Sequence, residues 1–227
     1  MAALLPEEKE TILTRNLRWY GHASFLVLDG KNIYIDPWEI PESQPKADLI
    51  FITHAHFDHC SPEDVKKMTK PETLVVGPPD CLEAVGYGKK GLSVKPGEKI
   101  APLGLSVQVV PAYNLKPERS NFHPKKNNWV GYILEVNGVK YYHAGDTDQI
   151  PEMENLSPHV ALLPIGGTYT MDKNEAMSAA RAIKPEVVCP MHFGKVPGVG
   201  TPEDGEKFAA LCQQNQIKAK ALTKYTA

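Results

Sequence analysis

The stretch "ITHAHFDHC" (52–60) constrains this chain most, because three histidines and an aspartate fall within six positions after an apolar run. The run itself, within "ADLIFITHA", is typical of a strand buried on both faces. His54 and His56 alternate by two and face the same way if the strand continues, whereas Asp58 and His59 fall in the following turn. Such a set suits a divalent metal, and its spacing can serve two neighbouring metals. The alternative, a row of surface histidines, fits poorly with the buried strand before it.

Composition places the chain among ordinary globular proteins and excludes several classes of partner. The 227 residues are 42% hydrophobic and 23% charged, with a net charge of −2, so no basic field attracts nucleic acid or a membrane surface. Residues 1–10, interrupted by Pro6, resemble neither a signal peptide nor a membrane span, and no other apolar run is long enough. The 4 cysteines are scattered, so we expect no disulfides and a cytoplasmic location. The oligomeric state is left open.

Strand patterns dominate the chain. "LRWYGHASFLVLDGKNIYIDP" predicts two β-runs joined by an Asp-Gly turn, and "WVGYILEVNGVKYYHAGDT" a hairpin with an Asn-Gly turn. Further strands are expected in "TLVVGP", "LSVQVVPAY", "VALLPIGG" and "EVVCPMHFG". Ser61, Pro62 and Asp64 form an N-terminal capping pattern for a helix, and two later segments, 174–183 and 202–214, have helical spacing.

A pattern that occurs in both halves of the chain indicates how these elements combine. Each half contains a hairpin whose second strand leads to an aspartate, Asp36 or Asp146, and a buried strand follows each. Two such halves suggest two sheets packed face to face with helices outside, in one domain over residues 1–227. Two segments fit neither pattern: 114–128 is a long loop, which is usually functional or disordered, and 86–99 is expected to be a turn region.

Three motifs in order resemble the metallo-β-lactamase-fold hydrolases. They are H-x-H-x-D-H after the apolar strand, "AGDT" at 144–147 and "CPMHFG" at 189–194, and the resemblance spans residues 18–194. "YGHASFLV" and "YHAGDT" look like the branch that contains ascorbate-6-phosphate lactonase. The resemblance implies an α/β fold, a four-layer αββα sandwich of two mixed β-sheets with outer helices.

The resemblance also implies a ligand set for two divalent metals, with zinc expected and manganese or iron as alternatives. One metal would take His54, His56 and Asp146. The other would take Asp58, His59, Asp146 and His192. The family's histidine before the long loop is replaced here by Asn114, in "VVPAYN". Either His123 folds back to complete the first site, or Asn114 or water stands there.

Further residues receive roles around these metals. A hydroxide held between the metals would attack the substrate, with Asp58 orienting it and His22 donating a hydrogen bond to the substrate. Asp36 and His143 are expected behind the ligands, where such groups orient them. The proton donor for the leaving group is left open among His22, Tyr113 and Tyr169. His159 is expected at the surface.

The substrate is inferred from the charges of the long loop. Segment 116–126 carries Lys116, Arg119, His123, Lys125 and Lys126, opposed by Glu118 alone. If it covers the site, it favours an anionic substrate, and a solvated mobile loop is the equal alternative. Lys195 lies just after His192 and adds support, while Tyr169 could contact substrate. The leading hypothesis is therefore a metal-dependent hydrolase acting on a small anionic ester, lactone or phosphodiester.

Three other functions remain open beside this hypothesis. A nuclease of the same fold is disfavoured because the chain has no basic stripe and no added nucleic-acid domain. A di-iron redox protein would need the flavin domain that such relatives carry. A catalytically silent metal-binding scaffold has Asn114 as its one supporting feature.

Overall fold

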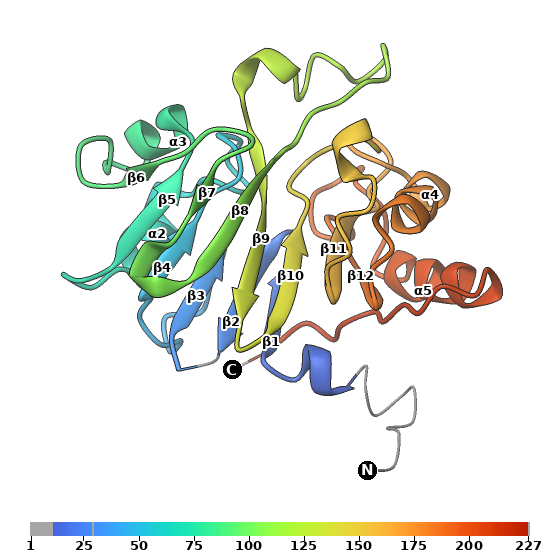
Figure 1. The fold of residues 1–227 in the computed structure, drawn as a ribbon, viewed down its shortest axis with the longest axis horizontal. Coiled ribbons are helices and arrows are strands. Elements are labelled where there is room, and N and C mark those ends of the chain that lie inside the picture. Colours follow the sequence, from blue (N-terminus) through green and yellow to red (C-terminus); the bar gives the residue numbers. More distant parts are fainter. Residues whose placement is uncertain (1–10, 29, 227) are drawn as a thin grey trace.

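The computed structural model describes residues 11–28 and 30–226, whose strands form two six-stranded sheets (Figure 1). In the first sheet the strands lie side by side in chain order: β1 (Leu17–Gly21), β2 (Ser24–Leu28), β3 (Asn32–Ile35), β4 (Leu49–Phe51), β5 (Leu74–Gly77) and β6 (Leu92–Ser93). In the second sheet the strands also lie side by side in chain order, from β7 at one edge to β12 at the other. Its strands are β7 (Lys99–Ile100), β8 (Ser106–Pro111), β9 (Val130–Val136), β10 (Val139–His143), β11 (Val160–Pro164) and β12 (Val187–Met191).

The helices lie outside the two sheets, which gives the four-layer αββα metallo-β-lactamase fold that the sequence predicts (Figure 1). On the first sheet lie α2 (Pro62–Met68) and α3 (Pro79–Ala84), and on the second α4 (Lys173–Ile183) and α5 (Asp204–Gln214). Short 3-10 turns cover 102–104, 125–127 and 151–153. Ser61 caps α2 as expected, and its side chain accepts a hydrogen bond from the Asp64 amide.

The main core lies between the sheets. Phe25 and Phe51 of the first sheet share it with Tyr132 and Leu134 of the second, and the Phe51 and Tyr132 ring centroids are 5.0 Å apart. A smaller core, which includes Leu26, Ile50, Val65 and Leu82, fills the space between the first sheet and its helices. Each large apolar side chain so buried contributes about 1.5–3 kcal/mol relative to exposure. Alternate residues of one strand therefore serve different cores, as the period of two requires.

The sequence pattern that occurs in both halves of the chain corresponds to the same arrangement of three strands in each sheet. The antiparallel hairpin β2–β3 is followed by β4, parallel to β3, and the hairpin β9–β10 is followed by β11, parallel to β10. Both sheets are therefore mixed. Parallel strands end at the same edge of a sheet, so the polar residues that follow β3, β4, β10 and β12 gather at corresponding edges.

The structure corrects two expectations. The first predicted β-run is two strands, β1 and β2, because Gly21 (φ +99°) and His22 (φ +52°) turn the chain between them. His22 therefore lies in a turn and not on a strand. The segment 86–99, expected to be a turn region, contributes the short strands β6 and β7. The predicted Asp-Gly turn includes residue 29, and the prediction of no signal peptide concerns residues 1–10. Residue 29 and residues 1–10 lie outside the described residues.

No helix within residues 11–28 and 30–226 has the length and apolarity needed to span a bilayer.

Asp64 stabilises the first sheet by tying the segment after β3 to α2. Its carboxylate accepts hydrogen bonds from the amides of Glu39 (2.9 Å) and Ile40 (3.0 Å) and pairs with Lys67 (2.7 Å). Burial alone would raise the pKa of Asp64, but Lys67, the two amides and Ser61 lower it. A carboxyl whose pKa is lower in the folded protein adds stability above its ordinary pKa, and that stability is lost on acidification.

We therefore expect Asp64→Ala to lower the free energy of unfolding by about 2 kcal/mol, since two amides lose their acceptor. For a chain of this size that is a fall in Tm of about 4–8 °C at neutral pH, measured by circular dichroism. The difference from wild type should narrow as the pH falls below the ordinary value of 3.8. Exposed Glu63→Ala, on the same helical turn, is the control. Equal effects of the two substitutions at neutral pH would contradict this account.

Candidate metal centre

The loop that carries "HAHFDH" leaves the end of β4 and is held by the buried carboxylate of Asp36. The Thr53 amide and hydroxyl donate to Asp36 (2.8 and 2.6 Å), and His59 Nδ1 donates to Asp36 Oδ2 (2.8 Å). Since the Thr53 hydroxyl donates to Asp36, its oxygen is free to accept from His54 Nδ1 (2.9 Å). A carboxylate only accepts hydrogen bonds, so both imidazoles are held with their Nε2 atoms pointing away from Asp36.

A first group of metal-ligating side chains contains His54, His56, His123 and Asp146. Each offers one ligand atom, and these atoms all lie within 4.8 Å of one another. His54 and His56 come from the first sheet, whereas Asp146 follows β10 of the second. Gly145 (φ +64°) makes the approach possible, because a Cβ there would lie 2.8 Å from the Val130 carbonyl oxygen.

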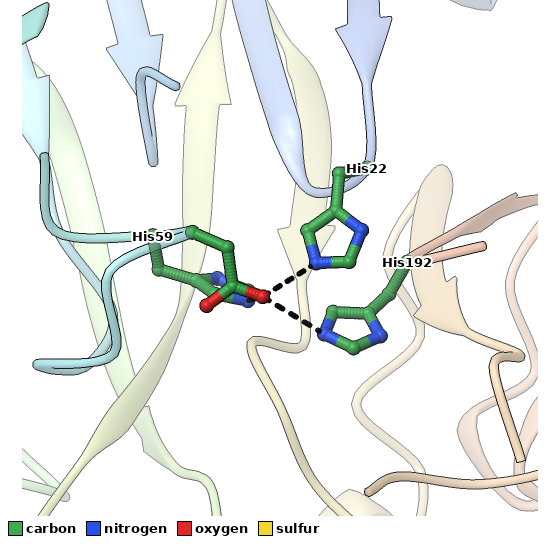
Figure 2. A group of neighbouring side chains, drawn as sticks. His22, His59 and His192 are labelled. Carbon is green, nitrogen blue, oxygen red and sulfur yellow. Dashed lines mark hydrogen bonds and ion pairs between the residues drawn. The ribbon is translucent and has the colours of Figure 1, made fainter. Parts of the chain in front are cut away.

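A second group contains His22, Asp58, His59 and His192, and its ligand atoms also lie within 4.8 Å of one another. Figure 2 shows the rings of His22, His59 and His192 converging from three separate segments. The His22 and His192 ring centroids are 3.9 Å apart, and the His192 amide donates to the His22 carbonyl (3.0 Å). His22 and His192 both have positive φ (52° and 59°), a conformation that costs energy and that clusters at functional sites.

Asp146 lies between the two groups. Its Oδ2 is 2.9 Å from His192 Nε2, 3.2 Å from His123 Nε2 and 3.8 Å from His54 Nε2, and its Oδ1 is 3.3 Å from His59 Nε2. One carboxylate therefore faces imidazoles of both groups. That is the placement needed by a carboxylate that bridges two metals.

The hydrogen bonding of these side chains fits metal ligands. The Nε2 atoms of His54, His59, His123 and His192 are buried, and among the described residues they have no hydrogen-bond partner. The short contacts to Asp146 thus lack hydrogen-bond geometry. Buried polar atoms are normally paired, so several unpaired nitrogens aimed at one carboxylate indicate room for cations.

The protonation states of these side chains also fit metal ligands. Burial, helped by neighbouring histidines, lowers the pKa of His22 to about 3 and that of His56 to about 4, and lowers the pKa of His54 well below its ordinary value. Burial would raise the pKa of Asp58 and Asp146, but the surrounding imidazoles lower it for both. Neutral histidines with ionised aspartates form the donor set that a divalent cation requires.

His59 is the exception. Burial would lower its pKa, but Asp146, Asp58 and Asp36 raise it to about 10. Three carboxylates thus attract a positive charge to this position, and a proton at His59 would compete with a metal there.

The long loop places His123, nine positions after Asn114, among the first group. Asn114 donates its amide to the His123 carbonyl (2.8 Å), and its side-chain Nδ2 lies 3.1 Å from His123 Nδ1. The same Nδ2 donates to the carbonyl oxygens of Arg119 (3.0 Å) and Tyr169 (2.7 Å). Asn114 therefore acts as a brace of the loop, behind the ring of His123.

Two of the cations expected to bind substrate from this loop, Lys116 and Arg119, are paired with carboxylates of the protein. Arg119 is buried, and its guanidinium pairs with Asp148 (2.5 Å) and Glu175 (2.7 Å). Lys116 also pairs with Glu175. Asp148 further accepts from the amides of Leu115 (2.7 Å) and Lys116 (2.9 Å), so these charges fasten the loop to α4 and to the segment after Asp146.

Three other residues that the sequence analysis placed near substrate also have partners within the protein. His22 is fully buried, and its Nε2 lies 2.9 Å from Asp58 Oδ2, so it adjoins the candidate ligands and not a substrate. The Tyr113 hydroxyl donates to Glu152 (2.8 Å). Lys195 lies 3.0 Å from Glu39 and 3.9 Å from the centre of the Trp38 ring.

The remaining histidines lie outside the two groups. His143 Nε2 donates to the Ala23 carbonyl (2.9 Å) and its Nδ1 accepts from the Gly145 amide (3.2 Å). Its ring therefore holds the backbone beside His22 and Asp146. His159 is partly exposed, and its Nδ1 accepts from the Lys140 amide (2.9 Å).

A cavity of about 220 Å³ opens beside the two groups. Its lining includes Asp58, Asp146 and Tyr169, together with three residues to which the sequence assigned no role: Phe57, Phe122 and Val196. Phe57 stands inside the histidine motif and Phe122 directly before His123. Their adjacency to candidate ligands is the sequence signal that could have marked them.

Comparison with known proteins identifies the family and supports this fold. Residues 16–192 match the family profile described as the beta-lactamase superfamily domain. A UPF0173 metal-dependent hydrolase of Thermoplasma acidophilum is 34% identical over 206 residues, 85% of this chain and 88% of that protein. A protein of Parabacteroides distasonis has a TM-score of 0.80 at 30% identity, covering 92% of this chain and 93% of that one. A metallo hydrolase of Ignicoccus hospitalis has a TM-score of 0.74 at 30% identity, covering 92% and 95%.

Removing the charge of Asp36 should weaken metal binding although Asp36 belongs to neither of the two groups described above. In Asp36→Asn the new amide has one accepting oxygen, so it can no longer accept all three hydrogen bonds from Thr53 and His59, and the imidazoles are held less firmly. We expect a fall in zinc affinity of about 10–100-fold, measured by competition with a chromophoric chelator. Asp48→Asn, a carboxylate that pairs with Lys70 away from the site, is the control. Equal affinities in the two variants would contradict the role of Asp36.

Arg119→Met should loosen the His123 loop, because it leaves two carboxylates without their buried partner. We expect a loss of roughly 3–5 kcal/mol of stability, faster cleavage of the loop 114–128 in limited proteolysis, and fewer metals per chain. Lys116→Met removes only an exposed partner of Glu175 and should change none of these. Identical proteolysis of the two variants would show that Arg119 does not hold the loop.

Proposed function

This chain belongs to the UPF0173 metal-dependent hydrolases of the β-lactamase superfamily, and from that membership we propose that it binds two divalent metals and hydrolyses an ester, lactone or phosphodiester. One observation carries the proposal: two adjoining groups of buried histidines and aspartates, with unpaired nitrogens, share Asp146 between them. We propose zinc, with manganese or iron as alternatives, because nitrogen and oxygen donors suit all three.

The first metal would be held by His54, His56, His123 and Asp146. The second would be held by Asp58, His59, His192 and Asp146, with His22 as a further donor. When bound, two such ions would supply Lewis acidity and lower the pKa of a water molecule toward neutrality.

The side chains around the cavity would handle the water and the leaving group. Asp58 lines the cavity, and its ionised carboxylate can accept a hydrogen bond from the attacking water and orient it. The water oxygen bonds to the carbonyl carbon or phosphorus, the bond to the leaving oxygen breaks, and one water proton ends on that oxygen. Of the three donor candidates, Tyr169 alone lines the cavity, so we assign that proton transfer to it.

A lactone belongs to this proposal because "YGHASFLV" and "YHAGDT" resemble the branch that contains ascorbate-6-phosphate lactonase. We also propose a small-molecule substrate over nucleic acid, since the net charge is −2. A cytoplasmic location fits the four cysteines, which are free and buried.

The test is metal content per chain in protein purified without chelators, by mass spectrometry, together with ester and lactone hydrolysis. We expect about two metals in wild type and in His159→Ala, a matched surface-histidine control. His123→Ala should hold fewer metals and lose at least about tenfold of activity, because a donor of the first group is gone. Chelation should abolish hydrolysis and added zinc should restore it. Less than one metal per chain after reconstitution would overturn the two-metal proposal.

A further inference from the structure

We infer that the substrate of this site presents a neutral alkyl or aryl group to an apolar wall of the cavity. The wall consists of Phe57, Phe122, Val196 and the ring of Tyr169. This inference rests on the proposed hydrolysis, because it names the part of the substrate that is not cleaved.

The wall is assembled from four separate segments. Phe57 lies in the loop after β4, Phe122 in the long loop, Tyr169 after β11 and Val196 after β12. The rings of Phe122 and Tyr169 meet edge to face, with centroids 4.7 Å apart, and Phe57 meets Trp38 in the same way at 5.8 Å. These contacts fix the rings at the cavity and leave their other faces open to a ligand.

The exposure of these rings is unusual for this chain. The chain has 6 phenylalanines, and Phe25, Phe51, Phe193 and Phe208 are buried. The remaining two, Phe57 and Phe122, are 68% and 42% exposed, and both line this one cavity. Apolar side chains gathered in the open at a concave site are typical of ligand contact.

The charges argue against an anionic group at this wall. No lysine or arginine is found among the described residues that line the cavity. Three nearby cations are held by carboxylates: Arg119 by Asp148 and Glu175, Lys125 by Glu152, and Lys195 by Glu39. A phosphate or carboxylate placed against the wall would lose its water without gaining a charged partner, which is unfavourable.

The polar side of the cavity is already assigned. His56, Asp58, His123, Asp146 and His192 face it, and all belong to the two donor groups. A substrate can therefore place its scissile group at the donors and the rest of the molecule against the rings. The division of the lining into a polar and an apolar side sets the orientation of the substrate.

Two esters of equal length test this inference on the zinc-loaded protein. 4-Nitrophenyl hexanoate ends in a methyl group, and mono-4-nitrophenyl adipate ends in a carboxylate at the same position. We expect kcat/KM at least about tenfold higher for the hexanoate, because the wall accepts an apolar end and rejects a charged one. Equal values, or a preference for the adipate, would overturn the inference.

Substitutions in the wall test whether it causes the preference for the hexanoate. Phe122→Ser should raise KM for the hexanoate at least about fivefold, with a smaller change in kcat, and leave the adipate unaffected. Val196→Lys should shift the preference toward the adipate by supplying the missing cation. Leu103→Ala removes a side chain of similar exposure (50%) that does not line the cavity, and should change neither ester. Equal loss on both esters in Phe122→Ser would also count against the wall.

The two proposals can fail separately. A protein that holds two metals and hydrolyses no ester, lactone or phosphodiester contradicts the proposed function. The inference is then decided by binding of the matched anilides, hexananilide and adipic acid monoanilide, followed by tryptophan fluorescence. Tighter binding of the neutral anilide, weakened in Phe122→Ser, supports the apolar wall, and the reverse order overturns it.

Discussion

The buried carboxylate of Asp36 is the interaction on which the metal centre depends. It is fully enclosed, at the end of β3, and it accepts hydrogen bonds from the Thr53 amide, the Thr53 hydroxyl and His59 Nδ1. Through Thr53 it also orients His54. An enclosed charge is tolerated only when its acceptor positions are filled, so the loop after β4 must return to it. Because the loop after β4 folds back to Asp36, the histidine motif lies at the end of the strand.

Neither sheet can complete a donor group alone. The first group takes His54 and His56 from the first sheet and Asp146 from the second, with His123 from the long loop. The second group takes His22, Asp58 and His59 from the first sheet and His192 from the second. The edges are joined by the Tyr132 hydroxyl, which donates to the Ile52 carbonyl (2.7 Å), and by the Val130 amide, which donates to Thr53 (3.1 Å). The donor groups can therefore form only when the two sheets pack together, and cations bound there would stabilise that packing.

Local features of the sequence were enough to predict the strands, the turns and the candidate metal ligands that lie within short motifs. Strand periodicity, the Asn-Gly turn and the Ser61 cap are decided by neighbouring residues, and "HAHFDH", Asp146 and His192 stand where strands end. His22 was misread because the turn that directs it inward depends on Gly21 and on backbone contacts with Trp19 and His192. The partners of Arg119 lie 29 and 56 positions away, so nothing adjacent in the chain reveals that its charge is engaged. Side-chain partners that lie far along the chain are therefore what the sequence does not reveal.

In the long loop, the charge of Arg119 holds the loop in place and is not available to attract a substrate. Arg119 is enclosed with Asp148, which lies two positions after Asp146, and with Glu175, which takes part in the capping box of α4. A guanidinium that holds two carboxylates in a fixed geometry has little capacity for a third anion. The same network thus fixes His123 beside Asp146 and removes from the cavity the cations that would select a charged substrate. What remains to distinguish substrates, away from the donors, is the shape and apolarity of the surface formed by Phe57, Phe122, Tyr169 and Val196.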